Sequence, residues 1–196
     1  MSLPRPSPTG VENSEQSGEF SLEERTALLQ LAHESILSAL EDREIPLEPP
    51  TPHFAEPRGA FTSLYLNGQL RGCVGYVLPT SSVYRAVAET ARAAAFEDTR
   101  FYPVTIEEAP RLQIELSILS PALPVTAEAV EVGRHGLLIS TSHRRGLLLP
   151  QVPVEHHWDR VTFLEQTCRK AGLPTDAWQK GATIEVFTAE IFGDKH

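Results

Sequence analysis

A two-residue turn signal, Asn67-Gly68, lies between two runs that favour β-strands, AFTSLYL and QLRGCVGYV. Both turn residues tolerate a positive φ, which the tight turns of β-hairpins require. We therefore predict an antiparallel hairpin over residues 60–66 and 69–77. With a two-residue turn and regular pairing, the predicted opposite pairs are Leu66 with Gln69, Leu64 with Arg71, and Thr62 with Cys73.

Helical and strand patterns alternate along the rest of the chain. Ser21 and Glu24 fit a capping box before a helix that runs to about Leu40, and small residues between 81 and 98 recur along one stripe of a second helix. RLQIELSIL, at 111–119, alternates apolar and polar residues as a strand with one buried face does. The remaining predicted elements are an irregular crossing over 44–59, a hairpin over 136–140 and 146–152, a helix over 158–171 and a last strand over 182–192. These elements predict an α+β fold with a mostly antiparallel sheet and flanking helices.

Length and composition limit the classes of protein that need to be considered. A chain of 196 residues suits one domain, or one domain with two lobes. Residues 1–18, rich in proline and serine, are expected to be a disordered tail, which leaves 19–196 as the folded domain. No apolar run is long enough to span a membrane and the N-terminal sequence lacks a signal peptide's apolar core, so we expect a cytoplasmic protein without a membrane partner. Seventeen basic against 26 acidic residues give a net charge of −9, which disfavours nucleic acid as a partner.

The cysteine and histidine content predicts no metal site. The two cysteines, Cys73 and Cys168, lie far apart in the sequence without a CxxC spacing, so both are expected to be free thiols. A structural zinc site needs about four well-spaced ligands, and no such set is present in the sequence. Cys168 falls in register with the apolar residues of its predicted helix, which favours a core position. We expect no metal and no cofactor.

The segment LRGCVG, residues 70–75, carries the strongest candidate chemistry. Two glycines weaken a strand, so they indicate a bulge or a close approach by a ligand or another backbone. On a regular strand Arg71 and Cys73 would share a face, where a guanidinium favours the reactive thiolate. Cys73 is therefore the candidate catalytic residue, and Arg71, Gly72 and Gly75 are candidate ligand-binding residues for an anionic group. The alternative is that Cys73 is a small residue packed under a helix and that Arg71 pairs with a nearby acid.

Further residues, distant in the sequence, could join this site through the fold. Glu115 lies mid-strand on a polar face, where it either faces solvent or lines a cleft. His135, His143 or Glu115 could supply the base that a nucleophilic cysteine usually requires. Arg144 and Arg145, a pair on the tip of the second predicted hairpin, could together bind a phosphate or a carboxylate, although basic tips are more often simply solvated.

Several of these segments together resemble one known family. The segments are GAFTSLYLNG, LRGCVG, AAFEDTRFYPVT, IELSILS, GRHGL, LPQV and CRKAGL, and they occur in the family's order. The chain resembles the AMMECR family, whose bacterial and archaeal members are called AmmeMemoRadiSam system protein A. The resemblance covers roughly residues 20–190 and leaves out the proline-rich N-terminal segment.

The resemblance implies a compact two-lobed domain with a groove near the Arg-Gly-Cys segment. It also implies an association with a Memo-like protein and a radical-SAM enzyme in a suspected modification pathway. It supplies no reaction, because the family's activity is not established. Two classes of function stay open. The first is an enzyme or enzyme component that binds a small anionic or aromatic ligand in a groove lined by Leu70–Gly75. The second is a non-catalytic adaptor that docks to one of those partners.

Overall fold

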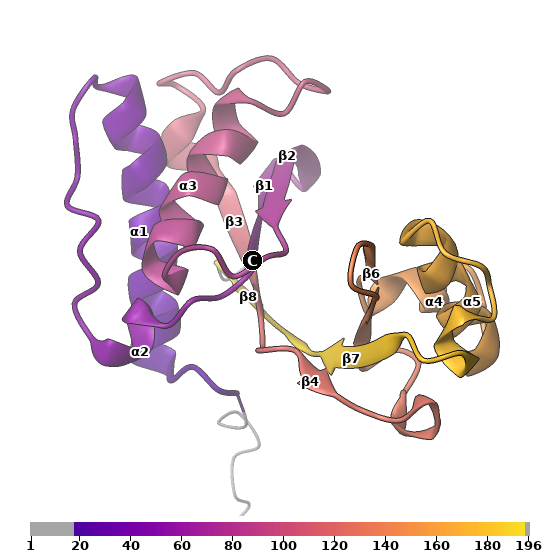
Figure 1. The fold of residues 1–196 in the computed structure, drawn as a ribbon. Helices are drawn as coiled ribbons and strands as arrows, with labels where there is room; N and C mark the ends of the chain where they lie inside the picture. The colour runs from indigo at the N-terminus through magenta and orange to yellow at the C-terminus, as the bar shows by residue number, and fades with distance from the viewer. Residues whose placement is uncertain (1–17, 195–196) are drawn as a thin grey trace, which may run out of the picture.

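The hairpin predicted from Asn67-Gly68 forms half of a four-stranded antiparallel sheet. The computed structural model describes residues 18–194; residues 1–17, on which most of the predicted tail falls, and residues 195–196 lie outside the described part. The first sheet contains β1 (Ala60–Leu66), β2 (Gln69–Tyr76), β3 (Gln113–Leu119) and β8 (Ala189–Gly193), in the order β2-β1-β3-β8 (Figure 1). Asn67 and Gly68 both have positive φ, as the turn requires. The predicted hairpin is confirmed.

The register of this hairpin differs from the regular pairing predicted from sequence. Leu66 pairs with Gln69 as expected, but a β-bulge follows, so that Leu64 lies opposite Gly72 and Ser63 lies opposite Cys73. Arg71 is the extra residue of β2. The predicted pairs Leu64 with Arg71 and Thr62 with Cys73 are therefore wrong. A bulge cannot be read from the turn sequence, because it depends on what packs against the strand further along.

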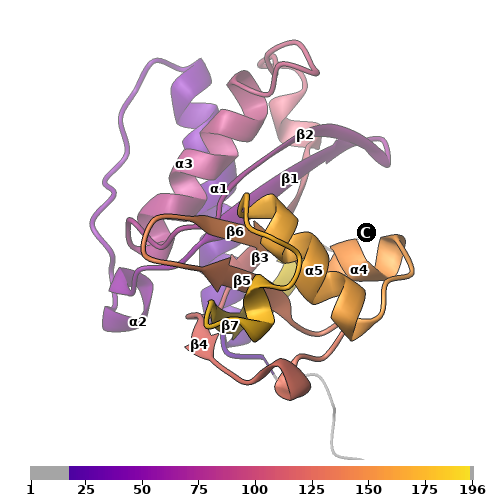
Figure 2. The ribbon, with the colours of Figure 1, turned by 45° about the vertical axis from the view of Figure 1, so that its right-hand side comes forward.

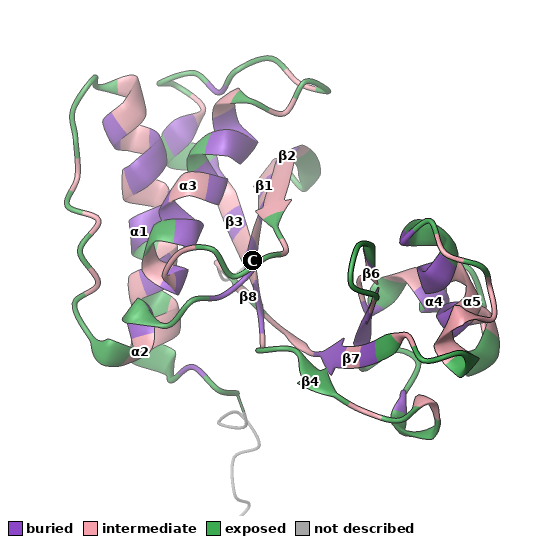
Figure 3. Ribbon diagram, viewed as in Figure 1, coloured by how far each residue is buried: buried purple, intermediate pink, exposed green. Residues whose placement is uncertain are grey.

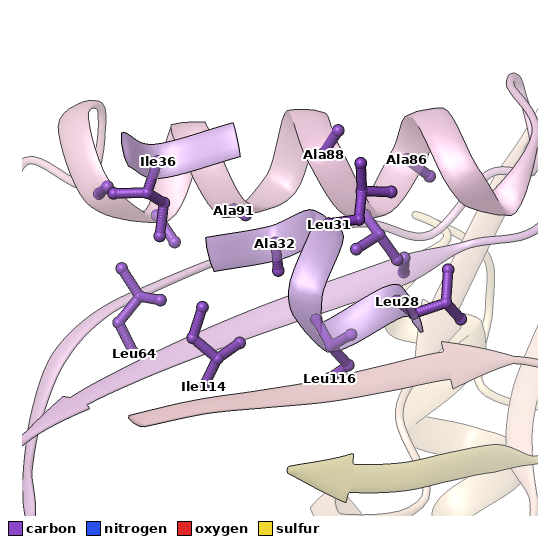
Figure 4. Packing of buried hydrophobic residues seen from close by; sticks show 14 of the residues in the cluster. Leu28, Leu31, Ala32, Ile36, Leu64, Ala86, Ala88, Ala91, Ile114 and Leu116 are labelled. Carbon is purple, nitrogen blue, oxygen red and sulfur yellow. The ribbon is translucent and has the colours of Figure 1, made fainter. Parts of the chain in front are cut away.

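Two long helices cover one face of the first sheet. α1 (Leu22–Leu40) begins with the predicted capping box, in which the Ser21 hydroxyl accepts from the Glu24 backbone N–H and the Glu24 carboxylate accepts from the Ser21 N–H. α3 (Val83–Phe96) presents a stripe of buried alanines, which lets it lie close to α1 and to the sheet. Figure 4 shows Ala32 and Ile36 of α1 above Leu64 and Ile114 of the sheet, with Leu28 nearer to Leu116. This layer is the larger hydrophobic core.

A second antiparallel sheet has its own, smaller core. It contains β4 (Leu123–Pro124), β5 (Gly136–Ser140), β6 (Arg145–Leu148) and β7 (Thr183–Phe187), in the order β4-β7-β5-β6. α5 (Arg160–Lys170) packs on one face through Phe163, Leu164 and Cys168 (Figure 2). We call this part the second lobe, and the first sheet with α1, α2 and α3 the first lobe. The predicted α+β class is confirmed, with two sheets in place of one.

Two predicted strands end differently in the structure. The strand predicted to reach residue 152 stops at Leu148, and the short helix α4 (Gln151–Glu155) follows Pro150. The single strand predicted over 182–192 is divided at Thr188 into β7 and β8, which belong to different sheets. At that point the Ser120 N–H donates to the Thr188 carbonyl (2.9 Å) and the Thr188 N–H donates to the Ser120 hydroxyl (2.9 Å). The two chain connections between the lobes are therefore bonded to each other.

The predicted irregular crossing runs from the end of α1 to β1 along the outside of α1 (Figure 1). It contains one short helix, α2 (Pro52–Ala55), whose Phe54 is buried. Figure 3 shows that residues before α2 are mostly exposed or half-buried, whereas the inward sides of α1 and α3 are buried. No helix within residues 18–194 combines the length and the apolar character needed to cross a membrane.

Candidate functional site

The face of the first sheet that the helices leave uncovered carries several reactive side chains. Alternation along β1 sends Ala60, Thr62 and Leu64 into the core and turns the residues between them to the opposite side. We call this opposite side the open face. Its central side chains, all half-buried, are Phe61, Ser63, Tyr65, Cys73 and Glu115. Since Ser63 pairs with Cys73 on one side and with Glu115 on the other, these three form one row across β2, β1 and β3.

Cys73 is held by contacts to both its side chain and its backbone. The Ser63 hydroxyl donates to the Cys73 Sγ at 3.3 Å. The Cys73 N–H, on the outer edge of β2, donates to the Asp98 carboxylate at 2.9 Å. Hydrogen bonds from Arg100, followed by the one from the Cys73 N–H, hold the pKa of Asp98 well below its usual range. This anchor covers an otherwise free strand edge and places a partly exposed thiol next to a hydroxyl.

Tyr65 and Glu115 extend the site away from Cys73. Burial raises the pKa of the Tyr65 phenol, and the nearby charges of Glu115 and Cys73 raise it further. The Tyr65 and Glu115 side chains line a hollow of about 520 Å³ together with Gln113 and Ile191. The structure therefore brings Glu115 and Cys73 to one face, about two strand spacings or roughly 10 Å apart. A direct hydrogen bond between them is not among the contacts of the described residues.

Arg71 lies on β2, the edge strand of the first sheet, and its hydrogen bonds hold the loop that follows α3 against this strand. Its guanidinium donates twice to Glu108, at 3.1 and 2.9 Å, and also to the carbonyls of Tyr102 (2.8 Å) and Pro103 (3.3 Å). Strand β1 separates it from Glu115 on β3. An anionic ligand at Arg71 would therefore have to displace the Glu108 carboxylate.

The two glycines of LRGCVG leave room for other parts of the same protein. A Cβ at Gly72 would lie 2.1 Å from the carbonyl oxygen of Ala94 in α3, and one at Gly75 would lie 2.0 Å from the Phe61 ring. Gly72 thus lets α3 approach the sheet, and Gly75 leaves space for the cross-strand aromatic ring. Neither position opens directly onto empty space.

A second hollow lies between the two lobes, at the end of the open face where β2 and β3 leave the sheet. It has a volume of about 340 Å³ and is walled by Val77 and Leu119 from the first lobe and by Leu138 and Leu147 from the second. Arg145 also lines it. The sequence predicts Arg144 and Arg145 together as a possible anion-binding pair. Arg145, the first residue of β6, lines the hollow, whereas Arg144 precedes the strand.

The other two predicted ligand-binding residues have local partners in the second lobe. The Arg144 guanidinium donates to the carbonyl of Gly172, just after α5. The His135 Nδ1 accepts the Glu131 N–H at 3.1 Å, within its own turn. Cys168 is fully buried in the second core, and burial raises the pKa of its thiol, as its position on an apolar helix face indicated.

One group of side chains has the composition of a metal site. Ligand atoms of Glu19, His53 and Glu56 lie within 4.8 Å of one another. The buried Arg58 donates to both carboxylates. Its guanidinium therefore already supplies, next to these carboxylates, the positive charge that a metal ion would bring. These contacts attach the segment before α1 to α2.

These features define the chain as an α+β protein with two antiparallel sheets, the first of which carries a thiol on its open face. The AMMECR1 family model matches residues 29–192. The chain therefore belongs to the AMMECR1 family, as its segments indicated.

Related proteins are similar to this chain over nearly their whole length. Protein Mbar_A1807 of Methanosarcina barkeri is 40% identical over 184 residues, covering 88% of this chain and 91% of that protein. Protein MK0488 of Methanopyrus kandleri is 40% identical over 188 residues, covering 90% and 91%. The crystal structure of the uncharacterized protein PH0010 from Pyrococcus horikoshii matches with a TM-score of 0.66 and 38% identity, covering 87% of this chain and 91% of that one. These names state no activity.

Proposed function

We propose that the protein binds a small anionic or aromatic ligand along the open face, and that Cys73 is the reactive group that the ligand meets. The observation that carries this proposal is the row of Cys73, Ser63 and Glu115 across three strands, with the Tyr65 phenol beside it. A thiol, a hydroxyl, a phenol and a carboxylate on one half-buried surface offer a ligand both proton donors and acceptors.

The inter-lobe hollow supports an aromatic or anionic ligand. Apolar side chains from both lobes suit a flat hydrophobic body, and the charged residues Arg58, Arg145 and Glu185 also line the hollow. Its volume of about 340 Å³ is within the range of small-molecule sites. The Arg145 guanidinium takes part in no ion pair or hydrogen bond of its side chain within residues 18–194. It is therefore available to a carboxylate or phosphate, whereas Arg71 is bonded to Glu108.

A titration with a simple aromatic anion tests the binding part of the proposal. Phenyl phosphate, with benzyl alcohol as its neutral counterpart, is added to ¹⁵N-labelled protein while amide shifts are recorded. We expect phenyl phosphate to shift amides of residues 59–65 and 73–78, and Arg145→Ala to weaken its binding several-fold. Arg144→Ala is the matched control, because that neighbouring arginine contacts Gly172. Shifts elsewhere, or equal effects of the two variants, would contradict the proposal.

The reactivity of Cys73 is tested separately with iodoacetamide at pH 7. Cys73 is half-buried, whereas Cys168 is fully buried and its thiol has a raised pKa, so Cys168 serves as an internal control. We expect alkylation of Cys73 in the native protein and of Cys168 only after unfolding, as measured by peptide mass. Equal and negligible labelling of both would leave Cys73 as a packing residue.

We further propose that this binding serves a modification pathway that includes a Memo-like protein and a radical-SAM enzyme. The family resemblance supports this part of the proposal. The test compares metabolites of cells that lack the protein, cells with the wild type and cells with Cys73→Ser. The proposal expects the Cys73→Ser profile to match that of the deletion. A Cys73→Ser profile identical to the wild type would remove the thiol from the function, and a deletion without metabolic change would remove the pathway.

A further inference from the structure

We propose that a groove on the outside of α1 binds a short, extended, basic peptide segment of a partner protein. The groove has a volume of about 860 Å³. It lies on the helical side of the first sheet, whereas Cys73 lies on the open face. The proposal is therefore independent of the ligand site described above.

The floor of the groove combines apolar positions of α1 (Ala27, Leu31 and Leu37) with the polar side chains of Gln30, His33 and Glu34. It is formed by the outward side of α1, from Ala27 to Leu37, and it is closed at one end by Phe54 and Tyr84, whose rings lie 5.9 Å apart. At 1.5 Å per residue this stretch of α1 is about 15 Å long, which accommodates four or five residues of an extended chain. The apolar positions of this floor can take the apolar side chains of such a peptide, and the polar positions can contact its polar side chains.

One wall of the groove is itself an extended segment with free backbone groups. In residues 44–50, exposed and half-buried positions alternate; Ile45 and Leu47 pack onto the larger core, while Glu44, Pro46, Glu48 and Pro50 line the groove. No backbone group of 44–50 takes part in a hydrogen bond among those of residues 18–194. The segment thus resembles an isolated edge strand, which can pair with an added peptide through the N–H groups of its non-proline residues and through its carbonyls.

The charge of the rim favours a basic peptide. Glu44 and Glu48 form no ion pair within the described part of the chain. Arg43, the one arginine at the rim, is bonded to Glu34 at 2.6 Å and to Glu41 at 2.5 Å. The net field at the rim is therefore negative, and lysine or arginine side chains on the peptide complement it.

Selection from a library of random heptapeptides displayed on phage tests the proposal with the full chain as bait. We expect enriched peptides that combine lysine or arginine with alternating apolar residues. Their affinity should fall about tenfold or more in the double variant Glu44→Lys with Glu48→Lys. The matched control, Glu155→Lys with Glu165→Lys, makes the same change in net charge in the second lobe and should change affinity less than about twofold.

A second variant tests the floor of the groove. Ala27→Trp fills the groove at a half-buried position of α1, and it should abolish binding while the thermal unfolding midpoint stays near that of the wild type. Peptide binding should also slow amide hydrogen exchange at residues 44, 45, 47 and 48. Failure to enrich any peptide, equal binding by the two charge variants, or protection elsewhere would overturn the proposal. It would also be overturned if those amides exchanged slowly in the free chain and lost that protection on removal of residues 1–17, since the occupant would then belong to this chain.

Discussion

Replacing Arg71 by alanine tests whether the main role of this arginine is to stabilise the fold by joining β2 to the loop after α3. The change removes two hydrogen bonds to Glu108, at 3.1 and 2.9 Å, and the bonds to the Tyr102 and Pro103 carbonyls, at 2.8 and 3.3 Å. The side chains of the pair are only 15% and 23% exposed. Water can therefore replace the lost contacts only in part, and the loop after α3 loses its attachment to β2.

The expected loss of stability follows from these contacts. Removing one partner of a fully buried ion pair costs about 3–5 kcal/mol, whereas an exposed pair contributes about 0–1 kcal/mol. Arg71 and Glu108 lie between these limits and nearer to the buried one. We expect Arg71→Ala to lower the free energy of unfolding by about 2–3 kcal/mol, which corresponds to a fall of about 4–12 °C in the unfolding midpoint. The free energy of unfolding is measured by urea titration with circular dichroism as the signal.

The pH dependence of this loss gives a sharper test. Hydrogen bonds from Arg71, followed by the Thr105 N–H, lower the pKa of Glu108. A carboxyl group whose pKa is lowered in the folded state stabilises the fold above its unfolded pKa, and this contribution disappears as the pH falls through the folded pKa. The difference between wild type and Arg71→Ala should thus be largest at pH 7 and should shrink below about pH 4.

Two outcomes would refute this reasoning. A loss of less than about 0.5 kcal/mol at pH 7 would mean that the pair contributes no more than an exposed one. An undiminished difference at pH 3.5 would mean that Glu108 is not the partner that matters. Arg71→Lys is the control that keeps the charge without the planar fork, and it should recover only part of the stability.

Three other predictions concern the residues that shape the first lobe and the second core. Gly72→Ala should destabilise the protein by about 2 kcal/mol or more, because its Cβ would lie 2.1 Å from a backbone oxygen of Ala94; Gly68→Ala, with a φ of +76° and no neighbour within 4 Å, should cost only about 1 kcal/mol of conformational strain. Equal costs in chemical unfolding would contradict this difference. Ser21→Ala should lower the free energy of unfolding by about 1 kcal/mol through loss of the α1 cap. An unchanged unfolding temperature in calorimetry would show that the cap is dispensable. Cys168→Ser should cost about 1–3 kcal/mol by placing a hydroxyl in an apolar core, and a neutral effect in urea unfolding would argue against that burial.

Part of the candidate site could be predicted from the sequence because its signals are local. The polar positions of β3 follow from alternation, so Glu115 was expected to face away from the core, and it does. The unusual composition of LRGCVG indicated Cys73 as the residue of interest. The pattern indicated Arg144 and Arg145 as a pair, and only the packing of the two lobes decides that Arg145 lines the hollow between them.

The sequence by itself determined the features that arise within one turn or one strand. The Asn67-Gly68 turn, the Ser21–Glu24 capping box and the alternation of β3 each depend on residues a few positions apart, whose conformational preferences act before any tertiary contact forms. The glycines of LRGCVG indicated a bulge or a close approach, but only the tertiary structure decided that the bulge falls at Arg71, which residue pairs with its guanidinium, and where the last strand divides. Arg71 meets Glu108 only after α3 has packed on the sheet, and β7 and β8 separate only because each completes a different sheet. Such contacts join residues that are distant in the chain, so no local pattern specifies them.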